Sequence, residues 1–145
     1  MAVKPIPENY PRVSPYLIVK DVEKTMEFIK YVFGGKEREK MEMADGSVNH
    51  AEMSIGDSVI MMGKASNEHQ IQNTMLYIYV EDTDASYKKA LEKGAVSVME
   101  PADQFYGDRN AGVKDKDGIN WWIATHVEDV SPDEIKRRND ERSKS

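Results

Sequence analysis

The sequence predicts an α+β protein built from two β-α-β-β-β modules. A short apolar run, an aspartate and a helical pattern occur twice in the same order. Tyr77 lies 61 positions after Tyr16, and Asp82 lies at the same distance after Asp21. Each helical pattern ends on glycine and is followed by three strand-like segments. A chain of 145 residues suits one domain, or two small halves that share a core.

This repeat divides the chain into five expected segments. The modules should be joined by a polar linker and flanked by a proline-rich arm and a charged end. The segments are residues 1–12 (N-terminal arm), 13–62 (first module), 63–73 (linker), 74–126 (second module) and 127–145 (C-terminal helix and tail).

The first module begins with a buried strand and a helix. The strand is the apolar run 16–19. Asp21 suits a helix N-cap, because its carboxylate can accept from the free N–H groups of the first turn. Gly34 and Gly35 suit the helix end. The apolar stripe of this helix consists of Val22, Met26, Ile29 and Phe33.

Three strands should follow, at about residues 36–43, 48–55 and 58–62, with a tight turn at Gly56-Asp57. A two-residue turn pairs Ile55 with Ser58 and Glu52 with Met61. Successive side chains along each strand then point to opposite faces of the sheet. One face, Ala51, Met53, Ile55, Ile60 and Met62, should pack on helices; the other carries His50, Glu52, Ser54 and Met61.

The second module repeats this order. A strand over 75–80 leads to Asp82 and to a helix that ends at Gly94, with a weaker stripe of Ala85, Tyr87, Ala90 and Leu91. A strand over 95–100 should end at Pro101, which acts as a breaker. The last hairpin turns at Asp117-Gly118 and leaves through two adjacent tryptophans, whose rings should point to opposite faces.

The C-terminal segment has a well-formed helix start. Ser131 as N-cap, Pro132 at the first helical position and Glu134 form a capping box. Beyond it the residues are almost all charged, which predicts a short surface helix and a fraying tail.

Composition excludes several classes of function. The net charge of −6, from 26 acids and 20 bases, disfavours nucleic acid as a partner. No apolar run approaches the ~20 residues that span a bilayer, so no membrane partner is expected. The first residues lack the pattern of a signal peptide. The absence of cysteine excludes thiolate chemistry and fits a cytoplasmic location.

Two long runs carry a family resemblance. The sequences HAEMSIGDSVIMM (50–62) and YGDRNAGVKDKDGINWWIATH (106–126) resemble the vicinal oxygen chelate superfamily, which includes glyoxalase I, extradiol dioxygenases and bleomycin-resistance proteins. The resemblance covers roughly residues 13–126 and is sharper for the PhnB-like branch. Lys116 departs from the pattern, because the turn of that branch usually has proline there. The resemblance implies that the curved mixed sheets of the two modules surround a cavity, and that the protein is a homodimer whose modules pair between chains.

The same resemblance predicts that no metal and no other cofactor is bound. Metal-using members take ligands from the first and last strands of each module, at positions that correspond here to Ser14, Met61, Met75 and Trp122. None of these is His, Glu or Gln, and a divalent metal needs three or four nitrogen or oxygen donors.

His50 and Glu52 are the candidate catalytic pair. They lie two residues apart on the strand face that the family uses for its cavity, where an imidazole and a carboxylate could act as base and orienting group. The alternative is a polar strand face bound to water.

The candidate ligand-binding residues are Met61, Met75, Tyr106, Arg109 and Trp122. Met61, Met75, Tyr106 and Trp122 would form an apolar, polarizable lining, or alternatively fill core. Arg109 could hold an anion, or pair with Asp108 or another acid. Four residues in the following turn would place Arg109 on the face of Trp122, whereas three would place it on the other face.

Two functions follow from these residues. The first is a metal-independent protein that binds a small apolar or aromatic molecule in a dimer cavity. The alternative is a lyase- or isomerase-type enzyme that uses His50, Glu52 and Arg109, with no metal or with one at an unusual site. A third possibility is a vestigial cavity in a protein that acts by association.

Overall fold

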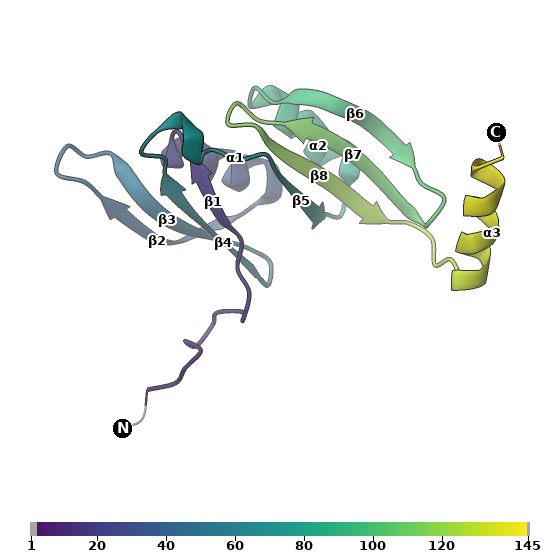
Figure 1. Cartoon of the computed structure of the whole chain (residues 1–145), viewed down its shortest axis with the longest axis horizontal. Coiled ribbons are helices and arrows are strands. Elements are labelled where there is room, and N and C mark those ends of the chain that lie inside the picture. Colours follow the sequence, from purple (N-terminus) through teal and green to yellow (C-terminus); the bar gives the residue numbers. More distant parts are fainter. Residues whose placement is uncertain (1–2, 145) are drawn as a thin grey trace. The chain divides into compact units, whose positions relative to one another are not determined.

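The computed structural model describes residues 3–144 and divides into two compact units between Thr74 and Met75. Each unit is a four-stranded mixed sheet with a helix on one face, which confirms the predicted α+β class and the two β-α-β-β-β modules (Figure 1). The ends of the predicted arm and tail, residues 1–2 and 145, lie outside the described residues.

The sheet of the first unit has the strand order β1-β4-β3-β2, in purple to blue in Figure 1. β1 is parallel to β4, and the other neighbours are antiparallel. A short 3-10 helix, η1, follows. The elements are β1 (Tyr16–Val19), α1 (Val22–Phe33), β2 (Lys36–Glu42), β3 (Val48–Ile55), β4 (Ser58–Lys64) and η1 (Glu68–Gln70).

Helix α1 begins and ends as the sequence predicts. The Asp21 carboxylate accepts from the backbone N–H of Lys24 at 3.2 Å, and Gly34 adopts the left-handed conformation with φ 67°. A Cβ atom on Gly35 would lie 2.6 Å from the Ile29 side chain. Glycine is therefore needed where the chain leaves the helix for β2.

The hairpin of β3 and β4 has the predicted register, with Ile55 opposite Ser58 and Glu52 opposite Met61. Met53 and Met62 are buried on the side of the sheet that α1 covers. The other side carries Tyr16, His50, Glu52 and Met61, and is named here the first open face.

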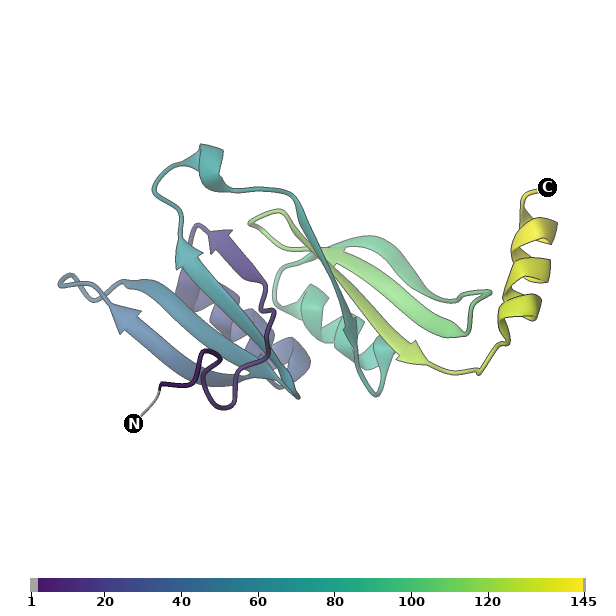
Figure 2. The same cartoon turned by 60° about the horizontal axis from the view of Figure 1, so that its bottom comes forward.

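The sheet of the second unit has the order β5-β8-β7-β6, with α2 along one side (Figure 2). The side covered by α2 buries Ala111, Val113, Trp121 and Ile123. The two adjacent tryptophans therefore separate as predicted, since Trp122 lies on the other side. The elements are β5 (Thr74–Tyr79), α2 (Thr83–Glu92), β6 (Val96–Asp103), β7 (Asp108–Lys114) and β8 (Ile119–His126).

Two local predictions in this unit are wrong. Pro101 does not end a strand but lies inside β6, where the register shifts between Met99 and Ala102. An edge strand tolerates proline at such an irregularity, because the missing N–H is not needed for pairing. In α2, Ala90 is buried but Ala85 and Leu91 are exposed, so the predicted stripe holds only in part.

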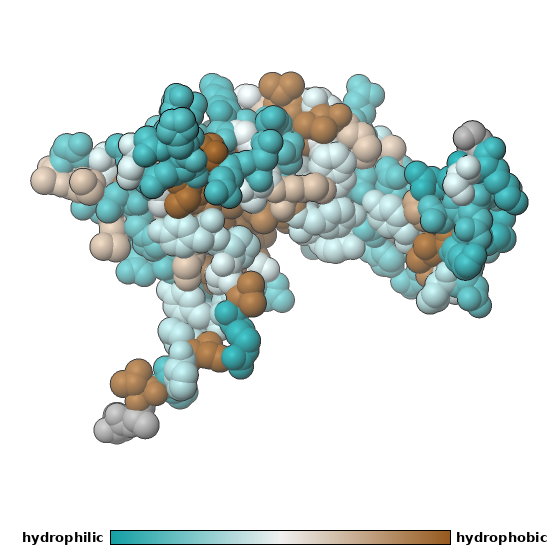
Figure 3. All heavy atoms as spheres, viewed as in Figure 1, coloured by the Kyte–Doolittle hydropathy of each residue, from teal (hydrophilic) through white to brown (hydrophobic). Residues whose placement is uncertain are grey.

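Helix α3 (Pro132–Arg142) starts at Ser131, whose hydroxyl accepts from the backbone N–H of Glu134 at 3.2 Å. It has no buried residue and a largely hydrophilic surface (Figure 3). Arg138 joins it to the turn before β7 through the Phe105 carbonyl at 2.9 Å. None of the helices within residues 3–144 is long and apolar enough to cross a membrane.

Candidate functional site

The first open face holds a hydrogen-bonded chain of three side chains. His50 Nε2 lies 3.2 Å from Glu52 Oε2, and His50 Nδ1 lies 3.0 Å from the Tyr16 hydroxyl. The short spacing on β3 brings His50 and Glu52 together, while Tyr16 arrives from β1 across β4. The sequence predicted the His50–Glu52 pair but not Tyr16.

Glu52 is the ionised end of this chain. Its side chain is buried, with 6% of the residue exposed. Burial opposes ionisation, but hydrogen bonds from Tyr10 and His50 outweigh it and lower the pKa of the carboxyl group. A carboxylate only accepts, so Nε2–H of His50 donates to Glu52. This places the Nδ1 atom of His50 3.0 Å from the Tyr16 hydroxyl.

The N-terminal arm contributes Tyr10 to the same face. Its hydroxyl donates to Glu52 Oε1 at 2.5 Å, and its ring lies 4.4 Å from the guanidinium carbon of Arg38. The hydrogen bond to Glu52 raises the pKa of the Tyr10 phenol. The arm thus lies against the candidate pair and covers the Glu52 carboxylate.

The side of the second sheet that faces away from α2 is named the second open face. Tyr77, Tyr79 and Met75 of β5 are 40%, 61% and 57% exposed there. Trp122 lies opposite Gly112, and a Cβ atom on Gly112 would stand 2.2 Å from its ring. The ring therefore lies flat across the bare backbone of β7. Met75 and Trp122, both predicted ligand-binding residues, share this face.

A polar cluster lies on the second open face beside these rings. Asp108 is 4% exposed, and its Oδ2 accepts from the hydroxyls of Tyr77 at 2.7 Å and Tyr79 at 2.9 Å. Its Oδ1 lies 3.0 Å from His126 Nδ1. Asn110, two residues along β7, donates from Nδ2 to the hydroxyl of Tyr106 at 2.7 Å and to that of Tyr77 at 3.2 Å.

Hydrogen bonds within this cluster shift the pKa values of its ionisable groups. Burial opposes ionisation of Asp108, but hydrogen bonds from Tyr77, His126 and Tyr79 lower the pKa of the carboxyl group. Burial and the bond to Asp108 raise the pKa of the Tyr77 phenol. The carboxylates of Asp108 and Asp129 raise the pKa of the His126 imidazole. His126 is thus half-exposed but hydrogen-bonded to Asp108.

Arg109 does not join the second open face. Asp115 N–H donates to the Ile119 carbonyl at 3.0 Å, so three residues form the turn and Arg109 pairs with Thr125. Arg109 therefore lies on the side of α2, where it binds Asp84 at 2.8 and 3.0 Å and Asp103 at 3.1 Å. An acid partner was one of the two expected roles. The partner is not the adjacent Asp108, because neighbouring strand residues point to opposite faces.

The four positions that correspond to the family's metal ligands offer poor donors. Ser14 precedes β1, Met61 lies opposite Glu52, Met75 is exposed and Trp122 covers Gly112. Thioethers and an indole do not replace imidazole or carboxylate oxygen around a hard divalent ion. Within residues 3–144, no group of three or more His, Cys, Asp or Glu side chains is arranged to hold a metal. The residues present do not fit the family's metal.

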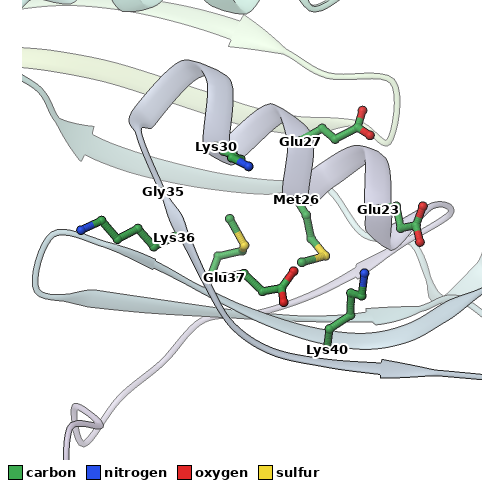
Figure 4. A pocket seen from close by; sticks show the side chains of 9 residues that line it. Glu23, Met26, Glu27, Lys30, Gly35, Lys36, Glu37 and Lys40 are labelled. Atoms are coloured by element: carbon green, nitrogen blue, oxygen red, sulfur yellow. The ribbon is translucent and has the colours of Figure 1, made fainter.

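A separate recess of about 450 Å³ lies between α1 and β2 (Figure 4). Met26 and Met53 line it together with charged side chains such as Glu27 and Lys30. Because Met53 points toward α1, this recess lies across the sheet from His50 and Glu52. None of the candidate catalytic or ligand-binding residues predicted from the sequence lines it.

Sequence reasoning missed Tyr10, Tyr16, Asp108 and Asn110. The alternation of side chains along β7 was the available signal. Gly112 lies opposite Trp122, and Asp108 and Asn110 point to the same face as Gly112 because side chains alternate along a strand. Nothing in the sequence placed Tyr10, since the arm has no strand or helix of its own.

The fold and these two faces define a protein of the glyoxalase type. Residues 11–123 match the Glyoxalase/Bleomycin resistance protein/Dioxygenase superfamily. An uncharacterized protein of Mycobacterium bovis is 31% identical over 137 residues, which cover 87% of this chain and 90% of that protein. The chain belongs to this superfamily.

Solved structures share the fold at low sequence identity. TioX from Micromonospora sp. ML1 is similar with a TM-score of 0.68 and 20% identity, over 81% of this chain and 99% of that chain. A fosfomycin resistance protein of Listeria monocytogenes, complexed with Mn(II) and dihydroxypropylphosphonic acid, is similar with a TM-score of 0.63 and 17% identity. That match covers 87% of this chain and 94% of the other.

Proposed function

We propose that this protein binds a small planar or aromatic molecule on its open sheet faces without using a metal. The observation that carries the proposal is the exposure of Met75, Tyr77 and Tyr79 on the face of the second sheet that also carries Trp122. Aromatic and thioether side chains gathered on a solvated face are typical of ligand sites, because they offer flat, polarizable contact area.

The fold is known to hold small molecules. A fosfomycin resistance protein of this fold was solved with a small phosphonic acid, together with Mn(II). In the present chain the metal-ligand positions carry Met61, Met75 and Trp122, which favour apolar contact over ion binding. Met61 and Tyr106 extend the proposed lining within their own units.

Isothermal titration calorimetry with naphthalene and indole tests the proposal. Trp122→Ala should weaken binding at least about tenfold, since the stacking of a flat ring on one aromatic side chain contributes ~1–3 kcal/mol. Tyr31→Ala, which removes another exposed ring from α1, is the matched control and should leave affinity unchanged. Absence of binding by wild-type protein, or equal effects of both variants, would contradict the proposal.

The chain from Tyr16 through His50 to Glu52 favours a second candidate, an acid–base enzyme of lyase or isomerase type. An ionised Glu52 that orients His50 leaves Nδ1 able to take the proton of the Tyr16 hydroxyl. Arg109 is given no role in this version, because Asp84 and Asp103 bind its guanidinium.

Turnover separates the two candidates. Activity that survives EDTA treatment and falls at least about a hundredfold in His50→Ala would establish the enzyme. Ligand binding that is unchanged in His50→Ala, with no turnover of candidate carbonyl substrates, would favour the binding protein over the enzyme.

We also propose a cytoplasmic homodimer of the PhnB-like branch. Each unit leaves one sheet face without cover from its own helix, and a second copy would supply it. Light scattering after size-exclusion chromatography tests the dimer; a monomer at micromolar concentration would contradict it.

A further inference from the structure

The Asn110 carboxamide on the second open face has an acceptor without a partner. Asn110 is 1% exposed, and among the described residues its Oδ1 is the buried side-chain atom that makes no hydrogen bond. Its Nδ2 is fully used by the hydroxyls of Tyr106 and Tyr77. Buried polar atoms are nearly always paired, so this oxygen calls for a donor from outside the chain.

The orientation of this amide follows from its neighbours. The Tyr77 hydroxyl proton goes to Asp108 Oδ2 at 2.7 Å, because an ionised carboxylate can only accept. The Tyr77 oxygen must therefore accept from Asn110, which requires the amide nitrogen on that side. Exchanging nitrogen and oxygen would break this bond, so the unpaired atom is the carbonyl oxygen.

Tyr106 is the group that a ligand of Asn110 would have to displace. It lies in the turn before β7, which is closed by backbone bonds from Gln104 to Asp108 and from Gly107 to Gln104. Its hydroxyl binds Nδ2 of the same amide whose Oδ1 is unpaired. A molecule that displaces this hydroxyl would meet the Oδ1 acceptor and an Nδ2 donor of one planar carboxamide.

We propose that Asn110 is the recognition group of a ligand subsite, and that its ligand is a planar lactam or cis-amide with N–H beside C=O. The N–H donates to Oδ1, and the C=O accepts from Nδ2 in place of the Tyr106 hydroxyl. The ring system of the ligand lies against Tyr77 and Trp122. This subsite rests on the proposed binding function and defines its ligand class.

Calorimetry with isoquinolin-1(2H)-one, its N-methyl derivative and naphthalene tests the subsite. The lactam should bind wild-type protein at least about tenfold more tightly than the N-methyl compound, which cannot donate. Asn110→Leu should lower the affinity for the lactam by a similar factor, to about that of the N-methyl derivative. Tyr106→Phe keeps the ring but removes the competing hydroxyl, and should increase the affinity for the lactam severalfold.

The outcomes separate the subsite from the binding function. Equal affinity for the lactam and its N-methyl derivative, or no gain in Tyr106→Phe, would overturn the subsite while naphthalene binding keeps the proposed function. Failure of all three probes would overturn both. The comparison of probes on wild-type protein and on Tyr106→Phe does not depend on whether Asn110→Leu folds.

Discussion

Arg109 and Trp122 lie on opposite faces of the β7–β8 pair. Arg109 is opposite Thr125 and points toward α2, whereas Trp122 is opposite Gly112 and points away from it. The three-residue turn that follows Asp115 sets this register. As a result, Arg109 forms its ion pairs on the side of the sheet that packs against α2. The face that bears Trp122 carries aromatic, thioether and buried polar groups.

Arg109→Ala should therefore leave ligand binding unchanged. It should lower the melting temperature slightly, because it removes the ion pairs with Asp84 and Asp103 at a largely exposed site. Calorimetry and thermal unfolding of the same sample measure the two effects. Trp122→Ala is the opposing control, which should weaken ligand binding. Lost affinity in Arg109→Ala at unchanged fold would show that the arginine contacts the ligand.

Glu52→Gln should destabilise the first unit by about 1–3 kcal/mol at neutral pH, because two hydrogen bonds lose their charged acceptor. The pKa of Glu52 is lowered by folding, so its stabilisation is present above the usual value near 4.5. It is lost as pH falls through the lower, folded pKa. Denaturant unfolding between neutral and acidic pH should show a shallower loss of stability in Glu52→Gln.

Glu39→Gln is the matched control, since Glu39 is the exposed strand neighbour of Glu52 on β2. Its acid dependence should match that of the wild-type protein. If both variants lose stability in parallel, net charge rather than the Tyr10–Glu52–His50 contacts governs the acid response.

His126 should titrate above its usual value near 6.5, because Asp108 first and Asp129 second favour its charged form. The stabilisation is fully present below that usual value and is lost as pH rises through the raised, folded pKa. Proton NMR of the His126 ring should show a larger fall in pKa for Asp108→Asn than for Asp129→Asn. The reverse order would mean that the exposed Asp129 is its main partner.

Local chemistry predicted much of the fold. Asp21, Asp82 and Ser131 each cap the helix expected of them, and a two-residue turn was enough to fix Glu52 opposite Met61. These features depend on neighbours within a few residues, so the sequence alone contains them.

The second open face could be predicted only in part. The face of Arg109 depends on whether three or four residues form one turn, and both lengths suit the same sequence. The cluster of Asp108 joins three strands, since Tyr77 comes from β5 and His126 from β8. Its hydrogen bonds span up to 33 positions in sequence, where no periodic pattern links the partners.

Gly112→Ala should displace the Trp122 ring and weaken ligand binding. The new Cβ would stand 2.2 to 2.6 Å from three ring atoms, so the indole must leave the surface of β7. The φ angle of Gly112 is not positive, and alanine adds no backbone strain there. We expect a changed near-UV circular dichroism signal, and a loss of affinity that approaches that of Trp122→Ala.

Gly63→Ala provides the matched comparison on the first open face. There the Cβ meets the end of the Tyr16 side chain at 2.8 Å, which can swing away and release His50. If the ligand binds on the second face, Gly63→Ala keeps its affinity, whereas a site at the Tyr16–His50–Glu52 chain would lose it. Equal affinities of Gly112→Ala and wild-type protein would mean that the ligand does not depend on the flat position of Trp122.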